Sequence, residues 1–200
     1  MFVDETTDSI VISMSETNGL ELAEFIKWAC EVTGKVFTFS DQELQNIGQG
    51  GNRVSFLGAL PFKRSRFKKD FFAFFQTMLY IKGFAVVGRG EGALEILEIV
   101  SMNGPRNREV TNGSKYVTPD ELPEYRNQTG VPILTTVALK NINATVANNA
   151  LRPFFAQSGA TAGTAGGLTF GTAGNNTSLL LQGFGPQVYD AVQLLLLVDK

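Results

Sequence analysis

Positively charged side chains gather in one short segment of the chain, directly before a group of phenylalanines. Seven residues hold five cations, Lys63, Arg64, Arg66, Lys68 and Lys69, and four phenylalanines lie between positions 71 and 75. Lysine and arginine attract phosphates and carboxylates, so this pattern is typical of a surface that binds nucleic acid or an acidic protein partner. The segment also fits a solvated first turn of a helix whose aromatic side chains are buried.

The position of these cations on a helix bears on the two interpretations. We expect a helix to begin near Ser65, so the cations lie at its N-terminus. Each cation there opposes the helix dipole at roughly 0.3 to 1 kcal/mol. An acidic surface on a neighbouring subunit or partner would offset that cost. We therefore take the five basic residues as a candidate partner or subunit interface.

The chain has no histidine and one cysteine. Without histidine, Ser-His-Asp and Cys-His nucleophile systems and histidine-ligated zinc are excluded. Cys30 cannot form an internal disulfide, and its place on the apolar face of a predicted helix predicts a buried, inert thiol. Glu91, Glu95 and Glu98 have no second carboxylate motif beside them. We therefore expect no catalytic, cofactor-binding or metal-binding residues, no cofactor, and a protein that is not an enzyme.

Glycine-rich loops occur at three places. The letters GTAG at 163–166 match the GxxG pattern of KH domains, which grips a nucleic-acid backbone beside basic residues. Here the loop lies between a predicted helix and a predicted strand, and residues 133–200 have only three cations against two carboxylates. Nucleic acid is therefore not expected as a partner of this part. The clusters at 47–51 and 88–92 are predicted turns, because they lack the lysine of a phosphate-binding loop.

The composition predicts a folded protein with a packed core. The chain has 200 residues, of which 44% are hydrophobic and 18% charged, and its net charge is −2. This length suits one large domain or two of about 100 residues. Residues 1–9 are acidic and polar, unlike a signal peptide, and the longest apolar run, 194–198, is too short to span a bilayer. We expect a chain that is soluble as it stands, without a signal peptide.

Hydrophobic spacing predicts an α+β first module with the order β-α-β-β-α-β-β. Apolar residues recur at helical spacing over 22–33, with Asn18 as a candidate cap and Gly34 as the expected end. A second helix is expected from near Ser65 to Gly83. Its predicted buried stripe consists of Phe67, Phe71, Phe74, Phe75, Met78 and Ile81. The predicted strands are 10–14, 36–39, 53–62, 84–88 and 93–99, the last two forming a hairpin.

The rest of the chain predicts a linker and a smaller second module. Residues 101–131 are rich in Asn, Gly, Pro and charges without a sustained period, which is typical of a linker. The second module has the predicted order β-α-β-β-α, with strands at 133–139, 168–170 and 177–182 and helices at 144–156 and 185–198. We expect Val188, Ala191, Val192, Leu195 and Leu196 to face inward. The predicted domains are residues 8–100 and 132–200.

Both modules resemble the N-terminal periplasmic domains of bacterial secretins, the outer-membrane channel proteins of type II secretion systems. The letters LELAEFIKWACEVTGKVFTF and the GFAVV strand with its hairpin resemble the first domain of that family. The letters TTVALKNINATVANNALRPFF and NNTSLLLQGFGPQVYDAVQLLLLVDK are similar to its next, KH-like domain. The resemblance covers roughly residues 8–100 and 133–200. It implies an α+β fold in which a secretin/TonB-short-type domain precedes a KH-like one.

The resemblance also implies a function. The chain would be a non-enzymatic part of a periplasmic vestibule, in which copies form a homo-oligomeric ring. Its other partners would be an inner-membrane component of a secretion or pilus machinery and the secreted protein cargo. In that family a membrane β-barrel follows, so membrane contact is expected only through a barrel outside this chain. The alternative is a free-standing adaptor or nucleic-acid-binding protein built from the same modules, which predicts salt-dependent nucleic-acid binding through residues 63–69.

Overall fold

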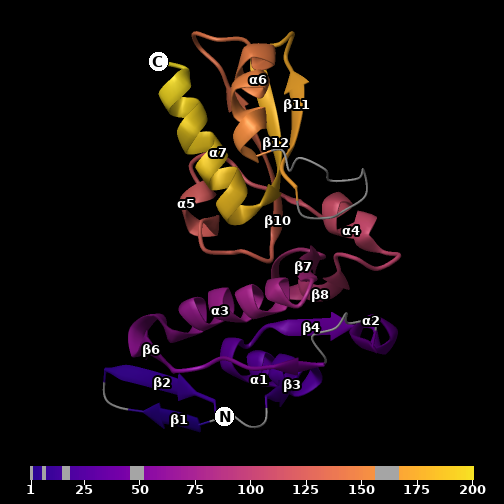
Figure 1. The fold of residues 1–200 in the computed structure, drawn as a ribbon, viewed down its shortest axis with the longest axis vertical. Coiled ribbons are helices and arrows are strands. Elements are labelled where there is room, and N and C mark those ends of the chain that lie inside the picture. Colours follow the sequence, from indigo (N-terminus) through magenta and orange to yellow (C-terminus); the bar gives the residue numbers. More distant parts are fainter. Residues whose placement is uncertain (1, 6–7, 15–18, 46–51, 156–166) are drawn as a thin grey trace.

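The computed structural model describes residues 2–5, 8–14, 19–45, 52–155 and 167–200, and it confirms the α+β class. The molecule is elongated, with strand β1 (Phe2–Glu5) and the end of helix α7 (Gly185–Val198) at opposite ends (Figure 1). The buried apolar residues form two main clusters, one between positions 10 and 99 and one between positions 117 and 195. A third, smaller cluster joins them.

The first module has two long helices among three small sheets. The helices are α1 (Leu22–Thr33) and α3 (Phe67–Ile81), and they pack on each other. One sheet has the order β1-β2-β6, with β2 at Ser9–Ser13 and β6 at Ala59–Lys63. A second has the order β4-β8-β7, in which β4 (Val36–Phe39) runs parallel to β8 (Ile96–Ser101) and β7 (Phe84–Arg89) runs antiparallel to it. The two-residue strands β3 (Leu20–Glu21) and β5 (Arg53–Val54) pair, and α2 spans Asp41–Gln45.

Helix α1 forms where the apolar spacing predicts it. Leu22, Phe25, Ile26 and Ala29 recur every three or four residues, and all four are buried. Gly34 ends the helix with a φ of 71°, and its backbone N–H donates to the carbonyl oxygen of Cys30 at 2.9 Å. A left-handed φ is one that glycine adopts without steric penalty. Cys30 is half-buried, so the prediction of a buried thiol is wrong.

The phenylalanines of α3 form the centre of the first module's core. Phe71 and Phe75 are fully buried, and the Phe75 ring lies 5.1 Å from the ring of Phe25 on α1. Phe67 and Phe74 are partly buried against the same cluster. The last member of the predicted stripe is an exception, because Ile81 is 67% exposed in the final turn.

The second module packs two helices against one face of a sheet with the order β11-β12-β10-β9. β10 (Pro132–Ala138) and β12 (Ser178–Phe184) are antiparallel, and β11 (Thr169–Ala173) pairs with β12. Alternate residues of both central strands are buried, which is the pattern of a sheet covered on one face. The face is covered by α6 (Ala144–Phe155) and α7. Leu196 is 51% exposed, so its predicted inward position is wrong.

Asp199 fixes the end of α7 to the loop that follows β10. Its carboxylate accepts hydrogen bonds from the backbone N–H groups of Lys140, Asn141 and Ile142, each at 2.8 to 2.9 Å. These bonds lower the pKa of the Asp199 carboxyl, because they favour its charged form. One side chain therefore holds together two segments almost 60 residues apart.

Residues 101–131 carry regular structure, contrary to the predicted linker. They contain α4 (Asn107–Asn112), β9 (Lys115–Tyr116) and α5 (Leu122–Tyr125), and β9 adds a parallel strand to β10. Val117 and Leu122 are buried in the second module's core. The domain boundaries at 100 and 132 stay a prediction.

The two modules contact each other directly. The rings of Tyr80 on α3 and Phe184 at the end of β12 meet edge to face at 5.1 Å. The backbone N–H of Val86 on β7 donates to the carbonyl oxygen of Gly130 at 2.8 Å. Apolar residues of β7, β8 and α4 pack around Phe184. The segment between the modules is therefore part of a packed junction. Among the described helices, none is long and apolar enough to cross a membrane.

Candidate functional site

The five predicted interface residues all lie on the surface. Lys63 is the last residue of β6, and a single 3-10 turn (Arg64–Arg66) begins and ends with the two arginines. Lys68 and Lys69 lie in the first turn of α3. The guanidinium of Arg66 donates to the carboxylate of Asp70 at 3.1 Å. Of the phenylalanines that follow, Phe71 and Phe75 are fully buried in the core, whereas Phe72 lies on the same side as Lys68 and Lys69.

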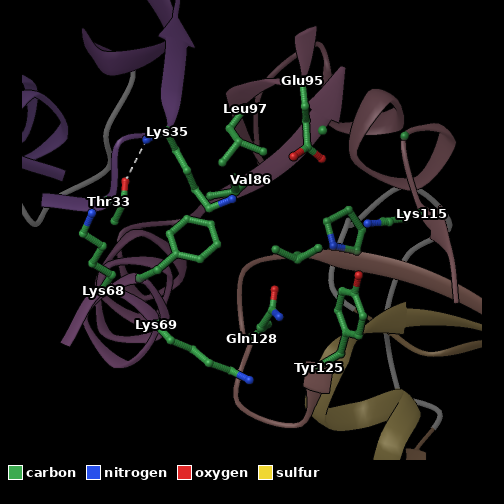
Figure 2. Close-up of a pocket in the computed structure, with 15 residues that line it drawn as sticks. Thr33, Lys35, Lys68, Lys69, Val86, Glu95, Leu97, Lys115, Tyr125 and Gln128 are labelled. Atoms are coloured by element: carbon green, nitrogen blue, oxygen red, sulfur yellow. Dashed lines mark hydrogen bonds between the residues drawn. The ribbon is translucent and has the colours of Figure 1, made fainter. Parts of the chain in front are cut away.

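Two of these lysines line a cavity of about 380 Å³ where the modules meet. Lys68 and Lys69 are joined there by Lys35, which follows α1, and by Lys115 of β9. In Figure 2, Lys35 and Lys69 approach the cavity from one side and Lys115 and Tyr125 from the other. Glu95 is the single carboxylate among the described lining residues. The cavity therefore carries an excess of positive charge in a chain whose net charge is −2.

Apolar groups form part of the cavity wall beneath the charges. They come from α3, from the sheet strands β7 and β8, and from the start of β10 with the residue before it: Phe72, Val86, Leu97, Val131 and Pro132. The Lys35 ammonium lies 5.1 Å from the centre of the Phe72 ring, a cation–π distance. The wall can thus contact both a carboxylate and an aliphatic side chain.

A second hollow of about 310 Å³ adjoins the first along α3. The two share Lys69, Phe72 and Gln128, and the second adds Arg66 and Arg126 among its lining residues. Because three residues border both hollows, together they form one groove between α3 and residues 123–132. We call this the inter-module groove.

Four charged side chains fix helix α4, which leads into the Lys115 side of the groove. Arg89 donates to Glu98 and to Glu109, each at 2.7 Å, and Arg106 donates to Glu98 at 2.6 Å and to Glu109 at 2.7 Å. Glu98 lies on β8, Arg89 on β7 and Glu109 on α4. These ion pairs bind α4 to the outer face of the sheet. The position of Gly113 and Lys115 follows from that attachment.

Hydrogen bonds and burial shift the pKa values of Lys115 and of two carboxyl groups in or beside the ion-pair network. Burial by itself raises the pKa of the Glu98 carboxyl, but its hydrogen bonds with Arg106 and Arg89 outweigh burial and hold the pKa below its usual range. Glu43 lies beside the network, and burial raises its pKa. A hydrogen bond with Tyr125 raises the pKa of Lys115, against the opposing effect of burial. Lys115 is therefore a fixed positive charge at neutral pH.

The sequence indicated only one side of the groove. Lys35 and Lys115 are isolated cations, 80 residues apart, and no local pattern connects them with the run at 63–69. Their shared position follows from β9 pairing with β10, which was not predicted. The GTAG pattern at 163–166 and the cluster at 47–51 lie outside the described residues. Within the part of the chain that the structure describes, no group of Cys, Asp or Glu could hold a metal ion.

No family model and no curated protein matches the sequence. Among solved structures, the chain is similar to a chain of the Klebsiella pneumoniae type II secretion system outer membrane complex, which holds PulD, PulS and the PulC HR domain. The TM-score is 0.61 at 16% identity, over 94% of this chain and 27% of that chain. This chain thus spans about a quarter of the length of the Klebsiella chain.

Two other solved structures match over nearly the whole chain with lower scores. The GspC–GspD complex of the enterotoxigenic Escherichia coli type II secretion system has a TM-score of 0.31 at 15% identity, over 96% of this chain and 98% of that one. The N-terminal domain of the Pseudomonas aeruginosa secretin XcpQ has a TM-score of 0.31 at 13% identity, over 96% and 64%. The Klebsiella match carries the structural conclusion: the chain has the fold of the N-terminal domains of type II secretion secretins.

Proposed function

We propose that this chain is the periplasmic region of an outer-membrane secretin channel, with no enzymatic activity of its own. The observation that carries the proposal is the match to the Klebsiella outer membrane complex over 94% of the chain at a TM-score of 0.61. A match of this extent includes both modules.

In this proposal, copies of the chain stand side by side in a ring that forms the vestibule of the channel. Small modules with flat sides associate through modest interfaces, and closed symmetry then adds avidity. The second module offers apolar side chains for such contacts. Phe154 is 73% exposed on α6, and the last turn of α7 exposes Leu196, Leu197 and Val198. We assign contacts between neighbouring copies to these two helices.

The first module then docks to an inner-membrane component of the secretion or pilus machinery, and secreted cargo passes through the ring. The similar Klebsiella structure holds the PulC HR domain together with PulD, which supports a protein partner of this kind. The five exposed cations of residues 63–69 are the candidate contact surface. Their charge would attract an acidic partner surface.

The experiment that tests the channel is the isolation of the full-length gene product from its native envelope in a mild detergent. We expect a large multimer in the outer-membrane fraction, because ring assembly brings many copies into one particle. Blue native electrophoresis and membrane fractionation measure this directly. Recovery as a monomer in the soluble fraction would contradict the channel and favour a free-standing adaptor.

Reversing the charge of the basic surface tests the docking role. Replacing Arg64, Arg66, Lys68 and Lys69 with Glu should leave the fold intact, since all four side chains are exposed. We expect reduced partner docking or assembly, measured as secretion by cells that carry the variant. A control with the same net change uses Lys27, Arg108, Lys140 and Lys200, which are also exposed. Unchanged secretion by the first variant, with its fold confirmed by circular dichroism, would count against the docking role.

A further inference from the structure

We propose that the inter-module groove binds an extended acidic segment of a partner protein, with carboxylates against the lysines and an apolar side chain against the wall. This binding does not depend on whether the chain belongs to a channel. It rests on the shape, the charge and the lining of the groove. These three properties select among possible ligands in turn.

The shape favours a chain segment over a small anion. The hollows of about 380 and 310 Å³ adjoin each other and share Lys69, Phe72 and Gln128. A single phosphate or acetate ion would occupy a small part of this space and contact one or two of its cations. An extended segment of several residues can follow the groove along α3 and use both hollows.

The charge favours an acidic ligand. Lys35, Lys68, Lys69 and Lys115 line the larger hollow against one carboxylate, Glu95. A hydrogen bond with Tyr125 raises the pKa of the Lys115 ammonium group, so this lysine stays positively charged. Gln128 adds an amide group that can donate a hydrogen bond to a carboxylate oxygen. Carboxylates of a ligand would therefore meet cations from three separate elements.

The lining favours a peptide over a nucleic acid. Besides the cations, the lining of the two hollows includes the carboxylates of Glu95, Asp70 and Glu124. A nucleic acid has a negative charge at every nucleotide and would be repelled at these places, whereas a peptide can place acidic residues only where lysines face it. Apolar wall residues such as Phe72 and Leu97 also suit an aliphatic side chain between the acidic ones.

The test is a fluorescence anisotropy titration of the 200-residue chain with a fluorescein-labelled peptide, Asp-Glu-Asp-Leu-Asp-Glu. The matched neutral probe is Asn-Gln-Asn-Leu-Asn-Gln. We expect saturable binding of the acidic peptide at low salt and weaker binding as salt rises, because screening reduces attraction between exposed charges. We expect the neutral peptide to bind at least about tenfold more weakly.

The decisive variant is the double substitution Lys35→Glu and Lys115→Glu, which leaves residues 63–69 unchanged. Both side chains are exposed, so the fold should persist. We expect an affinity for the acidic peptide about tenfold lower than that of the unmodified chain. The control, Lys27→Glu with Lys200→Glu, makes the same change in net charge away from the groove and should bind like the unmodified chain.

Three results would overturn the proposal. Equal loss of affinity in both double variants would mean that net charge alone attracts the peptide. Unchanged affinity in the Lys35 and Lys115 variant would place binding outside the groove. Tighter binding of a single-stranded oligonucleotide, with the same dependence on Lys35 and Lys115, would assign the groove to nucleic acid. None of these results changes the expectation of a large multimer in the outer-membrane fraction. The groove proposal and the channel proposal can therefore be contradicted independently of each other.

Discussion

Replacing Phe75 with alanine is expected to lower the free energy of unfolding by about 3 to 5 kcal/mol. Phe75 is fully buried, and its ring lies 5.1 Å from the rings of both Phe25 and Phe37. These three rings come from α3, α1 and β4, so the substitution leaves a cavity where three elements meet. Such a loss is a large part of the stability of a typical domain.

Urea denaturation measures this effect, with Trp28 fluorescence as the probe. Trp28 is the single tryptophan of the chain, and its ring lies 4.4 Å from that of Phe71 in the same core. The matched control is Phe154→Ala, the same change at a side chain that is 73% exposed. We expect this control to change stability by no more than about 0.5 kcal/mol. Similar losses in the two variants would contradict the core described for the first module.

The second large effect is expected from Gly185→Ala, at the start of α7. A Cβ atom here would overlap the backbone carbonyl oxygen of Tyr125 and lie 2.9 Å from that of Gln128. Both neighbours are backbone atoms, which cannot rotate away as a side chain can. We expect a loss of about 3 kcal/mol, towards the upper end of the usual range for overpacking.

The control for this substitution is Gly167→Ala. A Cβ atom at residue 167 meets no heavy atom within 4 Å. Both substitutions reduce the freedom of the unfolded chain to a similar degree, so the difference between them reports the steric clash. Circular dichroism during urea denaturation gives both values. Equal stability of the two variants would mean that α5 and the residues after it do not pack against the start of α7.

The long helices and the longer strands could be predicted because their residues repeat at a fixed spacing. Helix α1 spans the predicted apolar pattern and ends at Gly34, although Glu21 and not the expected Asn18 occupies its N-cap position, and the strand expected at 36–39 has the same bounds in the structure. The strand expected at 93–99 begins later, at Ile96, since residues 92–94 form a 3-10 turn. A turn of three residues is too short for apolar residues to repeat at a regular spacing that could be recognised in the sequence.

Residues 101–131 could not be predicted for a related reason. Helix α4 has six residues, and ion pairs with β7 and β8 hold it in place. Strand β9 has two residues and exists through its pairing with β10. Isolated elements of this length are unstable in water, so their stability comes from contacts that no local pattern encodes.

Only part of the candidate site could be predicted from the sequence. The other residues of the site are brought together by tertiary packing, which no local sequence pattern shows. The run at 63–69 stands out because its charges are adjacent in the sequence. Lys35 and Lys115 reach the same groove only through the packing of one module on the other. A property that arises from the junction cannot be found by examining either module alone.

The packed junction has a mechanical consequence. The ring contact of Tyr80 with Phe184, the hydrogen bond from Val86 to Gly130 and the hydrogen bond that the Gln182 side chain donates to the Thr111 carbonyl oxygen on α4 connect the modules at three separate points. A joint held at three points resists both bending and twisting, whereas a joint held at one point is a hinge. A sideways force on the first module would therefore turn both modules together as one lever.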